Sequence, residues 1–453
     1  MHRIFYKLCI CMQRRLAILL FVLPLVGFAQ NHTPKCGAEA LFRAIKQHNP
    51  AFTLSSFVSP VAKQTASQSE LTIPVIFHIV LNQDQVNELG GKAGIRKRVN
   101  SQLEIINRDF SAQNDQSSLP ADFAALAGNA HLRFALARRD IDGFPTEGFQ
   151  VQYTRKEGFY FHGIEGSGIA FSDAKYFKGD GDQAWDPTSY LNIWVVSLPV
   201  DNGEEAILGL TIPPSYVGAH TGIPINEQGI ILNYKAFGLQ EDSDDVFITG
   251  ATGGRTLTHE LGHYFGLRHI WGDDNGLCAD NGGEDDGIED TPPQGSPNYS
   301  CVEYPYYDDC SYEGDGIMFM NFMDYTPDDC VALFTMGQTG YMRSELSVDG
   351  PSYSLTQHPH LLESPDNDHD NSFSIWPNPS VENINIHFEQ PPQNLQGIYI
   401  IDALGRTVGI VSDYRSQGSY VFNTTLLANG IYFVHAVFNN FVECKPVVVT
   451  AVK

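Results

Sequence analysis

The stretch H-E-L-G-H-Y-F-G-L-R-H, residues 259–269, is the strongest indication of how this 453-residue chain folds. On a helix His259 and His263 lie four residues apart, so both rings leave one face and can bind one metal ion. Gly266 lets the backbone leave the helix in a conformation that is costly for residues with a Cβ, so that His269 can turn back as a third ligand. Three protein ligands leave one coordination position open, which is typical of a catalytic zinc site.

Glu260 directly follows the first histidine and is expected to act as the catalytic base. Its carboxylate could take a proton from the attacking water, whose pKa a zinc ion lowers toward about 7, and return it to the leaving amine. A bare H-E-x-x-H also occurs on ordinary amphipathic helices, but the longer pattern with Gly266 and His269 is much harder to explain in that way. The motif therefore predicts a metal-dependent endopeptidase.

A second function class stays open, in which the same zinc fold is a non-catalytic scaffold of a secreted adhesin or binding protein. Glu260 is intact in the sequence, and a binding scaffold has no chemical need for a base beside its metal. Glu260 therefore favours an enzyme over a binding protein.

Downstream of the zinc motif, N-F-M-D-Y at residues 321–325 narrows the comparison to one family. The extended motif resembles the metzincin clan of zinc peptidases, whose second mark is a tight turn carrying a methionine. Met323 and Tyr325 resemble the Met-turn and the following tyrosine of its pappalysin branch. The resemblance implies that Met323 forms an apolar floor under the histidines and that Tyr325 stabilises the oxyanion formed during attack. If Met323 did not follow the zinc motif, a methionine among aromatic residues would be interpreted as an ordinary core residue.

Further segments look like parts of the same family and extend the resemblance over roughly residues 70 to 345, within a predicted catalytic domain of residues 70–346. Two β-branched and aromatic runs predict buried strands, and an apolar spacing of three to four residues predicts a helix, which resembles the end of the family's first long helix. These segments are 71–80 and 190–196 for the strands, 103–114 for the helix, and G-I-E-D-T-P at 287–292. The implied fold is an α+β metzincin-like domain, with a twisted mixed sheet plus the zinc-binding helix. His78, inside the first strand, is expected to be a core histidine and not a ligand.

Charge and the first residues predict an exported protein. The formal net charge of −25 and the pI near 4.8 argue against nucleic acid or an anionic membrane as a partner. Arg14 and Arg15 precede an apolar run at 16–28, shorter than the roughly 20 residues that a membrane helix needs. We expect a signal peptide over residues 1–29, cut after Ala29, with a single membrane anchor as the alternative. The mature chain is then secreted or at the cell surface, exported through the periplasm, with no membrane span.

Six cysteines remain after the signal peptide, and four of them follow the zinc motif. An oxidising compartment favours two disulfides among these four, with three possible pairings; a second structural zinc is the alternative. The resemblance to the family implies Cys278 with Cys310 and Cys301 with Cys330.

Cys36 stands apart in K-C-G-A-E-A, inside a predicted pro-segment over residues 30–69. A thiolate is a good zinc ligand, so this cysteine could fill the open metal position and hold the enzyme latent. The sequence around it resembles the N-terminal Cys-Gly of bacterial pappalysin-like enzymes, which implies this role. A free thiol and a bridge to Cys444 are the alternatives.

The chain is rich in acid and glycine between residues 273 and 290. Carboxylate oxygens in such a loop suit calcium, although the spacing is not that of an EF-hand, and a solvated acidic loop explains the composition as well. The family resemblance favours calcium, with Asp286, Asp290 and Thr291 as contributors beside the catalytic zinc.

Asp328 bears on the choice of substrate. It matches a position where family members that prefer basic residues carry an aspartate at the floor of the S1′ pocket. A buried carboxylate there would form a charge-assisted pair with a guanidinium, which implies cleavage on the N-terminal side of Arg or, less well, Lys. The alternative is an exposed loop acid.

From residue 347 the composition changes twice. Residues 347–371, rich in Pro, Ser, Asp, Asn and His, predict a solvated linker. Residues 372–453 contain five alternating strands separated by turn residues, which predict a small β-sandwich. S-F-S-I-W-P-N-P-S from Ser372, D-A-L-G-R at 402–406 and A-N-G-I-Y-F-V at 428–434 resemble the C-terminal sorting domain of the type IX secretion system of Bacteroidetes. The resemblance implies that system's machinery as a partner; a carbohydrate-binding or adhesive sandwich is the alternative.

Overall fold

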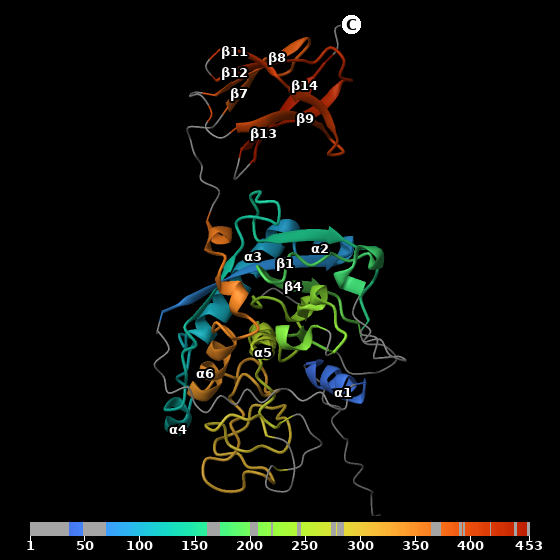
Figure 1. Cartoon of the computed structure of the whole chain (residues 1–453). Helices are drawn as coiled ribbons and strands as arrows, with labels where there is room; N and C mark the ends of the chain where they lie inside the picture. Colours follow the sequence, from blue (N-terminus) through green and yellow to red (C-terminus); the bar gives the residue numbers. More distant parts are fainter. Residues whose placement is uncertain are drawn as a thin grey trace, which may run out of the picture. The chain divides into compact units, whose positions relative to one another are not determined.

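The computed structural model places a mixed sheet, its covering helices and a separate β-sandwich (Figure 1). The signal peptide predicted over 1–29 lies outside the residues that the structure describes. The described residues are 36–48, 69–160, 173–199, 207–218, 221–241, 246–272, 278, 285–363, 373–388, 392, 395–416, 418–438 and 442–450.

A six-stranded sheet forms the centre of the first part of the chain. Its order is β2-β1-β4-β6-β5, and β3 also pairs with β1, beyond the end of β2. All neighbours are parallel except β5, which runs antiparallel to β6 and ends the order. The strands are β1 Leu71–Leu81, β2 Leu132–Leu136, β3 Phe149–Tyr153, β4 Leu191–Val196, β5 Gly209–Ile212 and β6 Gly229–Asn233.

Strand β4 is buried along its whole length, which shows that both faces of the sheet are covered. Side chains alternate across a strand, so Ile193 and Val195 pack in one core while Trp194 and Val196 pack in another. The first core contains α3 and α5, and the second contains α1. The helices are α1 Ala38–His48, α2 Gln83–Glu88, α3 Gly91–Phe110, α4 Ala121–Ala124, α5 Arg255–Tyr264 and α6 Met336–Glu345.

The two predicted strands and the predicted helix end are present as β1, β4 and the last turns of α3. His78 on β1 is fully buried, with Nδ1 2.7 Å from Asp182 Oδ2 and Nε2 2.9 Å from Asn192 Oδ1. It is a core histidine with polar partners on both ring nitrogens, as the sequence predicts.

Two disulfides close the segment between α5 and α6, and they join Cys278 to Cys310 and Cys301 to Cys330. This is the pairing that the family resemblance implies, and it leaves no cysteine of the four for a second zinc. Neither Cys36 nor Cys444 forms a disulfide within the described residues, so the bridge between them, one of the alternatives above, is absent.

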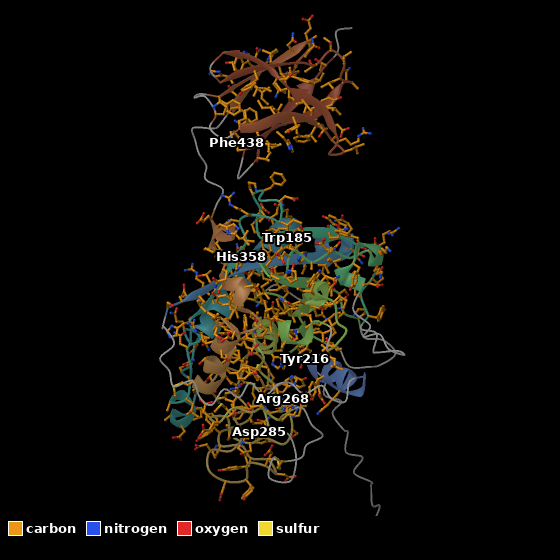
Figure 2. All side chains as sticks on the ribbon, in the orientation of Figure 1. Trp185, Tyr216, Arg268, Asp285, His358 and Phe438 are labelled. Carbon is orange, nitrogen blue, oxygen red and sulfur yellow. A yellow bond between two sulfur atoms is a disulfide. The ribbon has the colours of Figure 1, made fainter. Side chains whose placement is uncertain are left out.

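The prediction of a solvated linker over residues 347–371 is in part wrong. Residues 353–356 and 359–362 form short 3-10 helices, η7 and η8. Leu355 and Leu361 are buried, and the Leu361 carbonyl accepts a hydrogen bond from the Arg138 N–H at 2.7 Å. His358, labelled in Figure 2, lies 3.3 Å from Ser189 Oγ. Isolated leucines in a polar stretch pack against the sheet domain, which composition alone does not indicate.

Further 3-10 helices within the described residues are η1 Asp173–Lys175, η2 Phe177–Gly179, η3 Pro214–Tyr216, η4 Ile225–Glu227 and η5 Tyr234–Ala236.

The C-terminal part is an all-β sandwich of two antiparallel four-stranded sheets, ordered β10-β9-β13-β14 and β11-β12-β8-β7. Its inward-facing residues form one apolar core that includes Ile386, Ile400 and Val434. The strands are β7 Phe373–Trp376, β8 Asn383–Phe388, β9 Leu395–Asp402, β10 Thr407–Val411, β11 Asp413–Ser416, β12 Ser419–Asn423, β13 Gly430–Phe438 and β14 Val442–Val449.

Within the described ranges, no helix is both long and apolar enough to cross a membrane.

Candidate metal centre

Helix α5 carries the first two histidines, and the turn after it returns the third. The helix begins after Gly254, which has φ +71°, and ends at Tyr264. Gly266 has φ +85°, the left-handed region that favours glycine, and its N–H donates to the His263 carbonyl at 2.9 Å. The chain therefore reverses within a few residues and brings His269 back over the helix.

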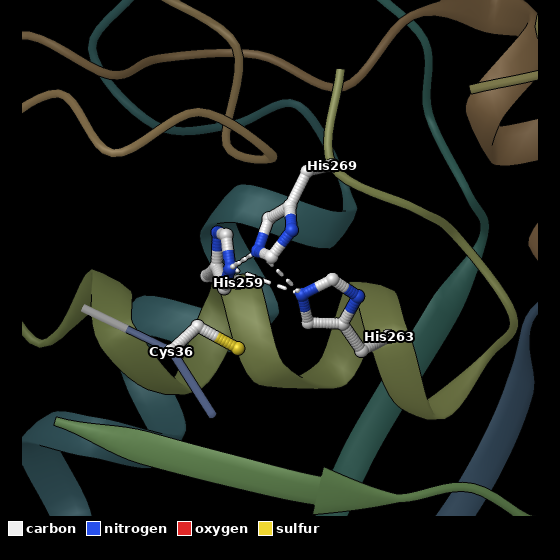
Figure 3. Close-up of side chains that lie close together, drawn as sticks. All are labelled: Cys36, His259, His263 and His269. Atoms are coloured by element: carbon white, nitrogen blue, oxygen red, sulfur yellow. Dashed lines mark hydrogen bonds between the residues drawn. The ribbon is translucent and has the colours of Figure 1, made fainter. Parts of the chain in front are cut away.

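Three imidazoles and one thiol converge on a common point (Figure 3). The Nε2 atoms of His259, His263 and His269 lie 3.1–3.2 Å from one another. Cys36 Sγ joins them, and the four candidate ligand atoms all lie within 4.8 Å. All four side chains are buried. Within the described residues they are the one group of three or more potential metal ligands that converges in this way.

The donor set fits zinc, which prefers nitrogen and sulfur ligands. His259 Nδ1 lies 2.7 Å from the Phe322 carbonyl oxygen, and His263 Nδ1 lies 2.8 Å from that of Leu267. Because a carbonyl only accepts, each Nδ1 carries the proton, and the Nε2 lone pair faces the common point. The two rings are thus held in the tautomer that a metal ligand requires.

Glu260 is buried beside the histidines and faces strand β5. Thr211 Oγ1 lies 2.6 Å from Glu260 Oε2 and 2.9 Å from the Glu260 carbonyl oxygen. Burial raises the pKa of Glu260 to about 7, against the lowering effects of the Thr211 hydroxyl and the Cys36 thiol. A Cβ on Gly209 would come within 2.5 Å of Glu260 Oε1, so only glycine lets β5 pass this close.

Met323 lies directly under helix α5 and is fully buried. A Cβ on Gly262, in the last turn of the helix, would meet Met323 Sδ at 2.3 Å. Asn321 Oδ1 accepts from the Met323 N–H at 2.9 Å, and the Ile270 N–H donates to the Met323 carbonyl at 3.3 Å. The turn therefore supports both the helix and the segment that carries the third histidine.

Tyr325 lies against the metal centre. Its ring centroid is 4.9 Å from that of His269 and 5.8 Å from that of His259. Its hydroxyl lies 3.3 Å from the Cys36 carbonyl oxygen, to which it donates.

The segment around Cys36 covers the centre by adding to the edge of the sheet. Cys36 forms a parallel bridge with Gly209 of β5, and the Gly37 N–H donates to the Gly209 carbonyl at 2.9 Å. Helix α1 follows, and its residues Leu41 and Ile45 are buried in the same core as Leu210. Arg268, labelled in Figure 2, lies over the ring of Phe42.

Asp328 is buried at the start of the zinc helix and is not an exposed loop acid. Its Oδ2 accepts from the N–H groups of Gly253 and Arg255, at 2.9 and 3.1 Å. Arg255 Nη1 donates to the Asp328 carbonyl at 2.7 Å. A carboxylate at this helix N-terminus stabilises the helix, since it satisfies donors that have no partner within the helix.

The candidate calcium contributors fall into two places, each with protein donors. Asp286 accepts from the Thr291 hydroxyl at 2.9 and 3.0 Å, and burial raises the pKa of Asp286 well above its usual range. Asp290 accepts from the Thr335 hydroxyl at 2.6 Å and from the Gly337 N–H at 2.8 Å, at the start of α6. Most of the acidic loop, residues 273–277 and 279–284, lies outside the described residues.

Sequence reasoning missed Thr211 and Trp271. Trp271 packs parallel to His269, with ring centroids 4.2 Å apart and an interplanar angle of 6°. Its place two residues after the third histidine is a signal that could have been noticed. Thr211 lies in a short strand far from the motif, and nothing in its surroundings indicates a partner.

Two family profiles match the chain. The peptidase M43 family, described as pregnancy-associated plasma protein-A, matches residues 178–347. The secretion system C-terminal sorting domain matches residues 374–450.

Solved structures similar to this chain include two forms of one bacterial enzyme. Mature mirolysin of Tannerella forsythia, solved with a cleaved peptide, is 37% identical; the match covers 65% of this chain and 99% of that chain, with a TM-score of 0.55. A promirolysin mutant of the same organism is 33% identical, over 73% of this chain and 100% of that chain, with a TM-score of 0.57.

Curated relatives match over a shorter region. An extracellular metalloprotease of Arthroderma benhamiae is 41% identical over 91 residues, which are 20% of this chain. One of Trichophyton verrucosum matches equally well. The chain spans 29% of the length of these relatives.

Proposed function

The chain belongs to the pappalysin family of metallopeptidases, and from this we propose that it is a secreted zinc endopeptidase made in a latent form. The observation that carries the proposal is the convergence of three Nε2 atoms, 3.1–3.2 Å apart, beside the carboxylate of Glu260. A zinc site with three histidine ligands and a neighbouring base can catalyse the hydrolysis of peptide bonds.

His259, His263 and His269 would hold the zinc that the family implies, which supplies a Lewis acid that polarises the scissile carbonyl and lowers the pKa of water. Glu260 accepts a proton from the attacking water as its oxygen bonds to the carbonyl carbon. Glu260 then gives this proton to the amine nitrogen as the C–N bond breaks. Tyr325 donates a hydrogen bond to the oxygen that becomes negative in the tetrahedral state.

The test uses the chain after removal of residues 30–69, assayed on casein and on peptides. We expect cleavage that stops when zinc is chelated and returns when zinc is added back. Glu260→Gln should keep the metal content and lose activity by at least about 100-fold, as is usual when general acid–base catalysis is lost. Zinc-dependent cleavage that survives Glu260→Gln would refute the assignment of the base. An adhesin on the same scaffold, the competing function, would bind zinc and cleave nothing.

Latency is assigned to Cys36 inside the pro-segment proposed over residues 30–69. Its thiol is the fourth donor of the cluster, and its backbone bridge to Gly209 covers the edge of β5 next to Glu260. Promirolysin, which is 33% identical and is matched over 100% of its length, is by its name a proenzyme, and this supports a latent form here. Removal of the segment would expose the centre and release the Tyr325 hydroxyl from the Cys36 carbonyl.

Cleavage before Arg, or less well Lys, is assigned to Asp328. The burial of this carboxylate, beside the zinc helix and five residues beyond Met323, supports the assignment. Its Oδ2 already accepts two backbone N–H groups, so a substrate guanidinium would share the carboxylate with them.

Structural calcium near Asp286, Asp290 and Thr291 is a further part of the proposal. The acid and glycine content of the loop supports it, although an ion would share these oxygens with the protein donors described above. Metal analysis of the purified chain checks it: calcium beyond one zinc per chain is expected, and zinc alone would contradict it.

The sorting domain makes the chain a secreted or cell-surface protein. We assign its recognition to the type IX secretion machinery, with domain limits of 70–346 for the peptidase and 372–453 for the tail. Deletion of residues 372–453 should retain the protein inside the producing cell without loss of the zinc-dependent activity of the purified enzyme. Secretion that persists without these residues would contradict the assignment.

A further inference from the structure

Trp271 lies flat against the third histidine of the metal centre. The ring centroids of Trp271 and His269 are 4.2 Å apart, and the ring planes differ by 6°. Trp271 is buried, so its indole ring cannot turn away into solvent without opening the core around it. The indole therefore restricts the imidazole to one plane.

The three histidines reach the common point by different means. His259 and His263 come from helix α5, and a backbone carbonyl holds each Nδ1. His269 comes from the irregular segment after the helix, so helix α5 does not fix its backbone as it fixes that of the other two. The ring of Tyr325 also restrains His269. It lies edge-on to His269, with ring centroids 4.9 Å apart and an interplanar angle of 77°, and edge-on to Trp271, at 4.8 Å and 71°.

We propose that Trp271 is a positioning residue that fixes the ring of His269 for metal binding and holds Tyr325 in place beside it. This rests on the proposed zinc peptidase function and deepens it. The stacked geometry also favours the metal-bound state electrostatically. An imidazole that donates to a cation becomes more positive, and the face of an indole ring carries negative charge density. Trp271 thus stabilises His269 more with metal than without it.

The experiment compares zinc affinity in the full chain by competition with a chromophoric chelator. Trp271→Leu removes the flat ring and should weaken zinc binding by about 10- to 100-fold, as substitutions of residues that orient metal ligands usually do. Trp271→Phe keeps an aromatic face and should recover most of the affinity. The matched control is Trp185→Leu, because Trp185 is a buried tryptophan edge-on to His78, a histidine outside the metal centre.

A second readout separates positioning from a general loss of stability. With cobalt in place of zinc at saturation, the visible spectrum of Trp271→Leu should differ from that of the wild type, while Trp185→Leu should keep the wild-type spectrum even if it unfolds at a lower temperature. If Trp271→Leu does not fold, the same spectrum and affinity are measured on Trp271→Phe against Trp185→Phe, and a smaller loss in the same direction is expected.

Wild-type zinc affinity and cobalt spectrum in the Trp271 variants would overturn this proposal and leave the peptidase function intact. Failure of the wild-type chain to bind zinc would overturn both. A loss of affinity in Trp185→Leu equal to that in Trp271→Leu would show a general packing effect and overturn the role of the stacked ring.

Discussion

Thr211 Oγ1 on strand β5 lies 2.6 Å from Glu260 Oε2 on helix α5, although the two residues are 49 positions apart in the chain. The strand that ends the sheet thus reaches the proposed catalytic base. Gly209, two residues earlier, lets the strand approach, because any Cβ there would contact the same carboxylate.

Removal of this hydroxyl should slow catalysis without removing the metal. A hydrogen bond to a charged group contributes about 1.5–3 kcal/mol, so Thr211→Val should lower kcat/KM by roughly 10- to 100-fold. Thr211→Ser keeps the hydroxyl and is expected to retain most of the activity. Peptidase assays on zinc-loaded, processed enzyme check this, and a Thr211→Val enzyme as active as the wild type would contradict it.

Replacement of Cys36 should make the unprocessed chain active. A serine hydroxyl is a much poorer zinc ligand than a thiolate, so the fourth position would open to water in Cys36→Ser. Peptide cleavage by intact Cys36→Ser, compared with intact wild type, is the measurement. Cys444→Ser, which changes the other cysteine outside the two disulfides, should stay latent. Equal latency of Cys36→Ser and the wild type would mean that helix α1 alone blocks the centre.

The preference for Arg should depend on the charge of Asp328. Peptides that carry Arg at each position in turn should be cut on the N-terminal side of Arg, and Asp328→Asn should reduce this preference by about 10-fold or more, since a charge-assisted pair is lost. Asp328 also stabilises the start of the zinc helix, so the unfolding temperature is measured in parallel. If the wild-type enzyme cuts equally well with or without Arg directly after the cleaved bond, the assignment of Asp328 is wrong.

Asp109 should make stability depend on pH. Burial raises the pKa of Asp109 to about 6, against the lowering effects of Arg255 and the Thr258 hydroxyl, while Asp328 raises it further. The folded state therefore binds the proton more tightly than the unfolded state. This contribution is fully present below about pH 4 and is lost as pH rises through about 6; it amounts to at most about 3 kcal/mol.

Denaturant unfolding at several pH values measures this dependence. Asp109→Asn should flatten the free energy of unfolding between about pH 4 and pH 6. Exposed Asp142→Asn serves as the control and should leave the slope unchanged. An unaltered slope in Asp109→Asn would rule out the contribution.

Loss of a disulfide should lower stability because the segment after the zinc helix has little regular structure. The Cys301–Cys330 bridge closes a separation of 29 residues, for which chain entropy predicts about 3.6 kcal/mol. The double variant Cys301→Ser with Cys330→Ser should unfold at a lower temperature in a thermal melt. Cys444→Ser is the control and should melt as the wild type does; a double variant with the wild-type melting temperature would contradict the expectation.

The C-terminal sandwich shows where pattern reading succeeds and where it fails. Five of its strands could be predicted from alternation, because each has an apolar row that faces the core. The remaining strands, β7, β10 and β11, all lie at sheet edges. These three strands have only four or five residues and are paired on one side, so their apolar pattern is weak; β14, also at an edge, has eight residues and was predicted. The same limit applied to residues 353–362, where two leucines in a polar stretch turned out to be buried.

The sequence by itself determined the metal-binding motif, the strands with unbroken apolar runs and the glycine turn that returns His269. These depend on helix periodicity, strand alternation and backbone sterics, which act between residues close together in the chain. The Thr211–Glu260 contact and the cap that Asp328 places on α5 were decided only by the tertiary structure. Each joins segments whose separation in the chain says nothing about their distance in space, until packing of the helices on the sheet brings them together.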